Sequence, residues 1–247
     1  MRSDDFVRLA VDWLKERVSS SNAKGLLFGL SGGLDSAVVA LLSKKAFPLN
    51  SLGVIMPIES RLEDIEDARK LAQELNLKTV EIDLNQVYQA FKAALPRGSQ
   101  LAYANIKPRI RMTVLYYLAN DLGYLVVGTG NKSEISVGYF TKHGDGGADL
   151  FPLAGIYKTD LLKMAADMGI PERILSKRPS AGLWEKQTDE GEMGITYEEL
   201  DTCLKFIEKG ENPPFKEEVV KKVKRMIEMS SHKRQPAPRL EIPYPSI

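Results

Sequence analysis

The residues in this sequence that are best suited to chemistry form one hexapeptide, Ser31-Gly32-Gly33-Leu34-Asp35-Ser36. It follows the apolar run 26–28 and opens the helical stretch 37–45, so it should link a strand to a helix. Two glycines let the backbone turn sharply and approach a ligand, and the free N–H groups at a helix start attract an anion. The serines add hydroxyl donors, and Asp35 can hold a metal ion. The hexapeptide is therefore predicted to cradle a phosphate group.

This loop differs from two common phosphate-binding motifs. A Walker loop would end in Gly-Lys-Ser/Thr, and a dinucleotide-binding turn would read G-x-G-x-x-G; the hexapeptide has neither pattern. The anion should therefore be held without a lysine in the loop. The alternative is an ordinary glycine-rich turn in which Asp35 caps the helix. The coincidence of strand context, glycine pair and carboxylate favours the phosphate site.

Three further polar segments are candidates for binding. The loop 129–134 follows the apolar run 125–128, which is predicted to be a buried strand. Parallel sheets bind ligands at the carboxyl ends of their strands, so this loop should share a crevice with the hexapeptide. The stretch 139–149 is too polar and glycine-rich for the interior of an element and indicates a binding loop. The long polar stretch 180–195 is typical of a lid.

The elements that must position these loops alternate between strands and helices. The runs 53–56 and 79–82 are two more predicted strands. Helical spacing of apolar residues predicts helices at 6–14, 63–75, 85–95, 108–121, 158–168, 197–208 and 215–229. This alternation predicts an α/β fold with a doubly wound, mostly parallel sheet and helices on both faces. No linker divides the chain, so residues 1–247 should form a single domain with an extended tail, 231–247, that holds four prolines.

Composition narrows the class of protein. Lysine plus arginine, 34, nearly balances aspartate plus glutamate, 33, so no overall field attracts nucleic acid or a membrane. The longest apolar runs are strand-sized and no signal peptide follows Met1, so a cytoplasmic protein is expected. A single cysteine, Cys203, and two histidines allow neither a disulfide within the chain nor a thiolate zinc site. Any metal should therefore be a hard ion such as Mg²⁺, held by carboxylates and phosphate.

The hexapeptide resembles the SGGxDS loop of the ATP pyrophosphatases, enzymes that split ATP between the α and β phosphates. More specific motifs follow along the chain in the order and spacing typical of the NAD synthetase family, within the N-type ATP pyrophosphatases. They are residues 128–134, 141–149, Pro152-Leu153, Tyr157-Lys158, the stretch 179–197 and His232-Lys233-Arg234. This resemblance implies an adenine nucleotide alpha hydrolase-like fold.

The resemblance also implies a reaction. NAD synthetases convert the nicotinate carboxyl of deamido-NAD into the amide of NAD, the last step of NAD biosynthesis, with ATP, Mg²⁺ and ammonia. The carboxylate takes the adenylyl group of ATP, pyrophosphate departs, and ammonia then displaces AMP. Positioning and electrostatics can supply most of such catalysis, without a protein nucleophile.

The same resemblance assigns roles to individual residues. It implies ATP contacts at Gly29, Leu30, Ser31, Gly32, Gly33, Leu34, Asp35, Ser36, Thr129, Lys158 and Ser180. Asp35 and Glu134 match the magnesium ligands of the family, with a helix cap and a surface acid as the alternatives. Contacts to deamido-NAD carry over to Arg109, Lys142, Asp149, His232 and Lys233. The residues implied to act in catalysis are Asp35, Glu134, Lys158 and Asp149.

Some positions depart from the family pattern or leave a choice open. Ser180 stands where threonine is common, but it keeps the hydroxyl. Arg109 is followed two positions later by Arg111, and either could face the ligand. Three lid acids are either ligands or solvated charges: Asp189, Glu190 and Glu192.

The nitrogen source and the partners also follow from the resemblance. Glutamine-dependent relatives carry an amidase domain with a catalytic cysteine, for which this chain has no room; Cys203 falls in a predicted helix and should be a core residue. Free ammonia is therefore expected, unless a partner chain delivers it. Family members are homodimers with the dinucleotide site near the interface. Two other functions stay open: another ATP pyrophosphatase, either tRNA-thiolating or like GMP synthetase, and a non-catalytic adenine-nucleotide sensor.

Overall fold

The computed structural model describes residues 2–184 and 186–241. Four strands form a parallel sheet in the order β3-β2-β1-β4, namely β1 (Gly25–Gly29), β2 (Ser51–Ile55), β3 (Lys78–Glu81) and β4 (Tyr124–Val126). All four predicted strands are present. β4 ends before Gly128, because Val127 forms only an isolated bridge to Leu150.

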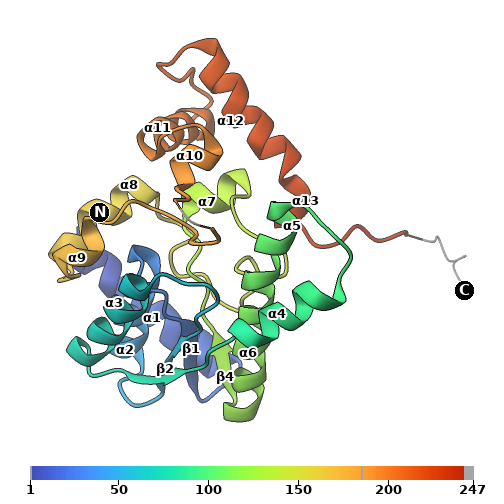
Figure 1. The fold of residues 1–247 in the computed structure, drawn as a ribbon. Helices are drawn as coiled ribbons and strands as arrows, with labels where there is room; N and C mark the ends of the chain where they lie inside the picture. The colour runs from blue at the N-terminus through green and yellow to red at the C-terminus, as the bar shows by residue number, and fades with distance from the viewer. Residues whose placement is uncertain (1, 185, 242–247) are drawn as a thin grey trace, which may run out of the picture.

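Helices cover both faces of the sheet (Figure 1). On one face lie α1 (Ser3–Ser20), α2 (Leu34–Ala46), α3 (Leu62–Glu74), α8 (Lys158–Asp167) and α9 (Glu172–Leu175). On the other lie α4 (Asn85–Ala94) and α6 (Ile106–Leu122), with the short α5 (Gln100–Ala104) between them in sequence. The doubly wound arrangement predicted from the sequence is confirmed.

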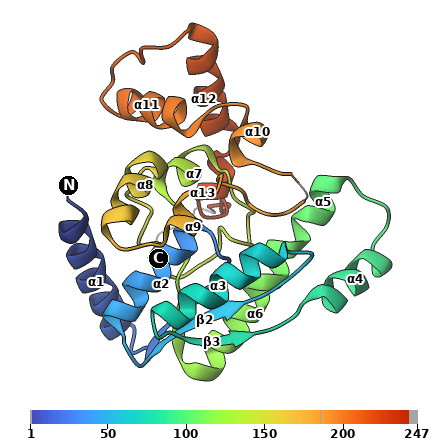
Figure 2. The same cartoon turned by 60° about the vertical axis from the view of Figure 1, so that its left-hand side comes forward.

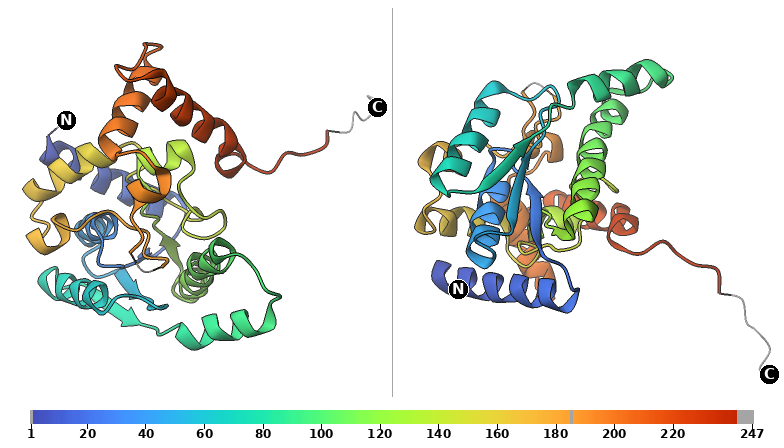
Figure 3. Two further views of the ribbon diagram at one scale, coloured as in Figure 1. Left: turned by 45° about the horizontal axis from the view of Figure 1, so that its top comes forward. Right: turned by 90° about the horizontal axis from the view of Figure 1, so that it is seen from below.

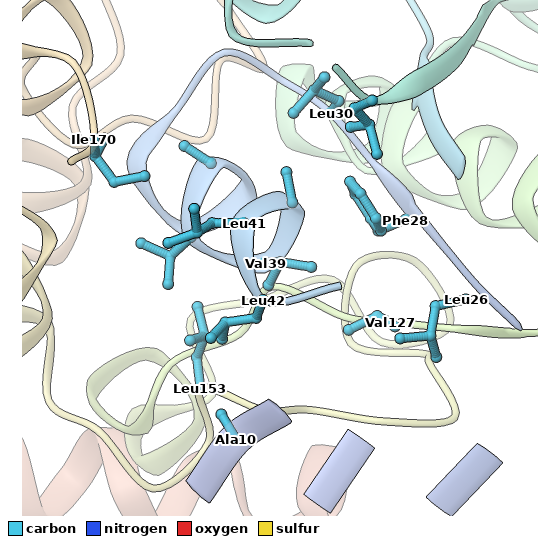
Figure 4. Packing of buried hydrophobic residues seen from close by; sticks show 14 of the residues in the cluster. Ala10, Leu26, Phe28, Leu30, Val39, Leu41, Leu42, Val127, Leu153 and Ile170 are labelled. Atoms are coloured by element: carbon cyan, nitrogen blue, oxygen red, sulfur yellow. The ribbon is translucent and has the colours of Figure 1, made fainter. Parts of the chain in front are cut away.

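The first strand shows why both faces are covered. Leu26 and Phe28 pack in the cluster formed with α1, α2 and α8 (Figure 4), whereas Leu27 packs in the cluster formed with α6. Successive side chains of a strand point to opposite faces, so a continuous apolar run needs a cover on each side. β1 is thereby fixed in the centre of the protein, and the loop that follows it starts from a rigid element.

The remaining helices lie together at one end of the molecule. They are α7 (Lys132–Val137), α10 (Asp189–Met193), α11 (Tyr197–Glu208), α12 (Glu217–Met229) and α13 (Ser231–Arg234). In Figure 2, α10, α11 and α12 lie above α7 and α8. Cys203 is buried here with Leu200 and Leu204, as predicted for a core residue. No helix among residues 2–184 and 186–241 is long and apolar enough to cross a lipid bilayer.

The second polar loop and the tail are more ordered than the sequence suggested. The loop predicted at 129–134 becomes helical from Lys132, because the Asn131 side chain and Glu134 form a reciprocal capping box. The tail expected to be extended from Ser231 begins instead with α13. The guanidinium of Arg234 in this helix donates to the carbonyls of Ser136 (2.5 Å) and Ile227 (2.7 Å). The chain leads away from the body only after α13 (Figure 3), and residues 242–247 of the predicted tail lie outside the described residues.

Candidate active site

The loop after β1 has the geometry of an anion cradle. Gly32 has a φ of +80°, and a Cβ there would collide with the carbonyl oxygen of Asp64, so only glycine fits. Gly33 is the N-cap of α2, and no side chain caps that helix end. The hydroxyls of Ser31 and Ser36 lie 3.0 Å apart, and Ser36 also donates to the Gly33 carbonyl at 2.9 Å. The tight turn thus places the start of the 13-residue helix α2 at the carboxyl end of β1.

The second loop meets the first at the carboxyl ends of adjacent strands. Asn131 follows β4 and is fully buried, with 0% exposure. Its side-chain oxygen caps α7 by accepting from the backbone N–H of Glu134 (3.1 Å), and its Nδ2 donates to Oδ1 of Asp35 (3.2 Å). The two loops therefore meet, as predicted, and we use the word crevice for the place where Asp35, Asn131 and Glu134 come together. Asn131 itself was not singled out from the sequence, although the N-x-x-E spacing is a capping signal.

Lys158 lies between the two predicted metal ligands. It is the first residue of α8, its side chain is 7% exposed, and its Nζ is paired with Asp35 and lies 3.4 Å from Oε1 of Glu134. Burial opposes the charge of Lys158, but the carboxylates of Asp35 and Glu134 outweigh it and raise its pKa. Burial raises the pKa of Glu134 to about 7; the charge of Lys158 opposes this rise and that of Asp35 adds to it. The protonation of Glu134 therefore depends on the charges of Lys158 and Asp35.

The lid segment contributes a third carboxylate. Asp189 in α10 is 4% exposed and accepts from the hydroxyls of Tyr197 (2.9 Å) and Tyr139 (3.2 Å). The Tyr197 hydroxyl also lies 3.2 Å from Oε1 of Glu134. Burial raises the pKa of Asp189, against the opposing charge of Lys158. Of the three lid acids weighed from the sequence, Asp189 is thus connected to the crevice, while Glu192 is exposed and binds Tyr139, and Glu190 accepts from the backbone N–H of Tyr197.

Four of the five residues assigned to deamido-NAD form a separate basic cluster, which we define as Arg109, Lys142, His232 and Lys233. The Lys142 Nζ donates to the His232 carbonyl (2.8 Å), and the Arg109 Nε donates to the Lys142 carbonyl (3.2 Å). Lys233 donates to the carbonyls of Gly138 (2.8 Å) and Phe140 (2.9 Å). Helix α13 therefore lies against the loop after α7.

The structure also separates the two neighbouring arginines. Arg109 is exposed and belongs to the basic cluster, whereas Arg111 donates through Nε to the Met56 carbonyl (3.0 Å), just beyond β2. Burial lowers the pKa of Arg111 to about 10. Arg109 thus lies with Lys142, as the family pattern implies, and Arg111 faces the strand ends.

Three predicted residues are not joined to the central carboxylates by the polar contacts of the described chain. Asp149 accepts from the Tyr116 hydroxyl (3.0 Å) and from the Val126 N–H (2.8 Å), which ties its loop to α6 and β4. Ser180 is exposed and donates to the Gln187 carbonyl within the lid (2.8 Å). Thr129 is half-buried at the end of β4.

The crevice offers two carboxylates of the kind that bind Mg²⁺. Asp35 and Glu134 offer the hard oxygen ligands that this ion prefers, and they already flank a cation, the ammonium of Lys158. Within the described residues, no group of three or more His, Cys, Asp or Glu side chains is placed to hold a metal ion. The two carboxylates therefore fit an ion that completes its shell with phosphate oxygens and water, as Mg²⁺ does in nucleotide sites.

Comparison with known proteins agrees with this geometry. Residues 6–237 match the model of the NAD synthase family. The NH(3)-dependent NAD(+) synthetase of Carboxydothermus hydrogenoformans is 54% identical over 230 residues, which are 91% of this chain and 92% of that protein. The structure of NMN synthetase from Francisella tularensis superimposes with a TM-score of 0.91 at 34% identity, over 98% of this chain and all of that one. That of NH3-dependent NAD synthetase from Campylobacter jejuni gives 0.86 at 28% identity, with the same coverage. The chain belongs to the NAD synthase family.

Proposed function

We propose that this protein is an ammonia-dependent NAD synthetase that amidates deamido-NAD at the expense of ATP, through an adenylated intermediate. The observation that carries the proposal is the meeting of Asp35, Glu134 and Lys158 at the ends of two adjacent strands, beside the anion cradle. Relatives named NH(3)-dependent NAD(+) synthetase, 54% and 50% identical to this chain, support it.

The reaction explains why such a site is needed. A carboxylate resists ammonia because its charge repels the nucleophile and its oxygen is a poor leaving group. In the first step a carboxylate oxygen attacks the α phosphorus of ATP, and pyrophosphate leaves. In the second, ammonia adds to the carbonyl carbon, AMP leaves with the bond electrons, and the nitrogen loses a proton. The enzyme must therefore bind pyrophosphate, align two anionic substrates and exclude water.

The chain's own groups supply these functions. The backbone N–H groups after Ser31 and the start of α2 bind the phosphates that become pyrophosphate. The ammonium of Lys158 stabilises negative charge that develops on the transferring phosphate. Asp35 and Glu134 would hold Mg²⁺, which when bound neutralises phosphate oxygens. The basic cluster binds the phosphates of deamido-NAD, and Asp149 accepts hydrogen bonds from its hydroxyls or from ammonium.

The lid and the assembly complete the proposal. Asp189 and the Tyr197 hydroxyl connect the segment 180–195 to Glu134, so the lid closes over the bound nucleotide and shields the anhydride from water. Residues 1–247 act as one domain, the tail following α13 reaches outward, and the enzyme works as a cytoplasmic homodimer.

A second substrate is favoured by one specific likeness. The neighbour with a TM-score of 0.91 is described as an NMN synthetase. The corresponding substrate for this chain would be nicotinate mononucleotide, which offers the same carboxyl group and lacks the adenylate half. Four basic residues in one cluster favour the dinucleotide, which carries an additional phosphate.

One assay tests the proposal. The protein is incubated with ATP, Mg²⁺ and ammonium, with either deamido-NAD or nicotinate mononucleotide, and AMP, pyrophosphate and the amide product are quantified. We expect equal amounts of AMP, pyrophosphate and NAD, and a higher kcat/KM for deamido-NAD. Amidation of the mononucleotide alone would reassign the substrate. Binding of ATP without turnover of either acid would indicate a nucleotide sensor and overturn the proposal.

A further inference from the structure

Asp201 is a buried carboxylate outside the crevice. It joins the starts of α7 and α8, the two helices that carry Glu134 and Lys158. Asp201 lies in α11 and is 2% exposed. One of its oxygens, Oδ1, accepts from the hydroxyl of Ser133 in the first turn of α7. The other, Oδ2, accepts from the backbone N–H (2.9 Å) and the hydroxyl (2.8 Å) of Thr159 in α8. A single side chain thus joins three helices.

The connection continues to the backbone of Lys158. Ser133 is completely buried, and its hydroxyl oxygen accepts from the Lys158 N–H at 2.8 Å while it donates to Asp201. Ser133 directly precedes Glu134, and Thr159 directly follows Lys158. The carboxylate therefore fixes the backbone next to the metal ligand and next to the ammonium, without touching either side chain in these contacts.

The contacts of this side chain favour a carboxylate. Its two oxygens accept three hydrogen bonds, and all three partners are donors. An asparagine could keep both bonds to Thr159 only by turning its NH₂ group toward the Ser133 hydroxyl, which would then have to accept where it now donates. A negative charge also suits the start of α8, where the first N–H groups have no partner in the helix. These contacts offset the cost of burying the charge.

The same face of α11 reaches the crevice one turn earlier. Tyr197 precedes Asp201 by four residues, so the two side chains lie on one side of the helix. The Tyr197 hydroxyl contacts both Glu134 (3.2 Å) and the lid residue Asp189 (2.9 Å). Helix α11 therefore contacts the crevice through Tyr197 and, one turn later, the starts of α7 and α8 through Asp201.

We propose that Asp201 is a positioning residue that sets the separation between the Glu134 carboxylate and the Lys158 ammonium and thereby governs the binding of metal and ATP together. The inference rests on the proposed function for the roles of Glu134 and Lys158. It predicts that loss of the carboxylate weakens the site for metal·ATP and slows adenylyl transfer, while the affinity for ammonia is unchanged.

The test compares Asp201→Asn with a matched control, Asp160→Asn. Asp160 is also an acid at the α8–α11 contact, where it pairs with Lys205 (2.8 Å), but its side chain is 41% exposed. In Asp201→Asn, kcat should fall, and the Mg²⁺ concentration for half-maximal rate should rise, each by roughly tenfold or more. The KM for ammonium should not change. Asp160→Asn should match the wild type in all three.

Calorimetric binding of Mn²⁺·ATP to the same proteins gives a readout that does not depend on turnover. Asp201→Asn should bind the complex about tenfold more weakly than the wild type. Unchanged affinity together with an unchanged kcat in a folded variant would overturn the inference. If the wild type binds Mn²⁺·ATP but amidates neither acid, the proposed function fails, and the binding comparison still decides the role of Asp201.

A milder variant covers the case in which Asp201→Asn does not fold. Thr159→Val removes the hydroxyl bond to Asp201 and leaves the backbone bond in place. It should weaken Mn²⁺·ATP binding severalfold with little change in thermal unfolding. Wild-type affinity in Thr159→Val would overturn the inference in that case.

Discussion

The ammonium nitrogen of Lys158 lies 3.4 Å from Oε1 of Glu134, so a lysine from α8 occupies the space in front of a carboxylate from α7. Asp35 pairs with the same ammonium, so one lysine faces carboxylates from two other parts of the sequence. Asp189 from the lid is linked to them through the Tyr197 hydroxyl, which contacts both Asp189 and Glu134.

The carboxylates of Asp35 and Glu134 should be needed for turnover but not for folding. Asp35→Asn and Glu134→Gln keep the shape of the side chains and remove the metal ligands, so we expect a loss of kcat of roughly a hundredfold or more. Thermal unfolding should change little, because each variant removes one buried charge and leaves the Lys158 ammonium paired with the other carboxylate. Glu63→Gln, at an exposed acid in α3, serves as the control. Normal rates in either variant would disprove the assignment of metal ligands.

Gly32 should accept no side chain. In Gly32→Ala the positive φ costs about 1–2 kcal/mol, and the new methyl group meets the carbonyl of Asp64, so the loop must move. We expect ATP affinity, measured by calorimetry, to be lost. Gly155→Ala is the matched control, because a Cβ there has no neighbour within 4 Å. Equal affinity in the two variants would show that the loop does not bind the nucleotide.

Lys177 should stabilise the protein in a defined pH window. Its Nζ lies 2.8 Å from Asp64 and 2.6 Å from Asp67. Burial opposes ionisation of Asp64, but hydrogen bonds from Arg61 and Lys177 outweigh it and lower its pKa below 3.8. Burial likewise opposes the charge of Lys177, and the two aspartates raise its pKa above 10.5. The stabilisation is therefore present between these values, and it is lost as the pH falls through the folded pKa of Asp64 or rises through that of Lys177.

Urea unfolding of Lys177→Met at several pH values measures this contribution. At pH 7 the free energy of unfolding should fall by about 2 kcal/mol, since two largely buried carboxylates each lose one of two cationic partners and the remaining exposure reduces the effect. The deficit should shrink below pH 3.8. Lys70→Met, which breaks an exposed pair with Glu66, should change it by about 0.5 kcal/mol or less. A deficit that grows on acidification would refute the ion-pair explanation.

The basic cluster should act on the dinucleotide and not on ATP. Lys142→Met removes one charge near the proposed phosphates of deamido-NAD, so we expect its KM to rise about tenfold with kcat and the KM for ATP nearly unchanged. Lys163→Met, an exposed lysine of α8, is the control. A change confined to the KM for ATP would place the cluster at the other substrate.

The sequence predicted the features that depend on local pattern. Apolar runs located the strands, and the rule that ligands bind at strand ends placed Asp35 near Glu134. The family resemblance added Lys158, whose position in a helix would otherwise suggest a solvated residue. The start of α7 was missed, although Asn131 and Glu134 have capping spacing, because the polar residues looked like a loop.

Long-range pairing of charges could not be predicted in this way. Lys177 and Asp64 are 113 residues apart, and Ser133 and Asp201 are 68 apart. Each charged residue looks like a solvated surface residue when only its sequence neighbours are considered. Asp189 was one of three equivalent lid acids, and only the burial of α10 against Tyr139 and Tyr197 separates it from Glu190 and Glu192.

The strand order has a consequence for how the chain is made. On the ribosome β1 can pair with β2 soon after it emerges, but its other edge receives no partner until Tyr124 has been synthesised. During that interval the growing polypeptide presents an open, apolar strand edge, which favours association with other nascent chains. Translation speed between β3 and β4, and chaperone access to that edge, should therefore influence the yield of folded protein.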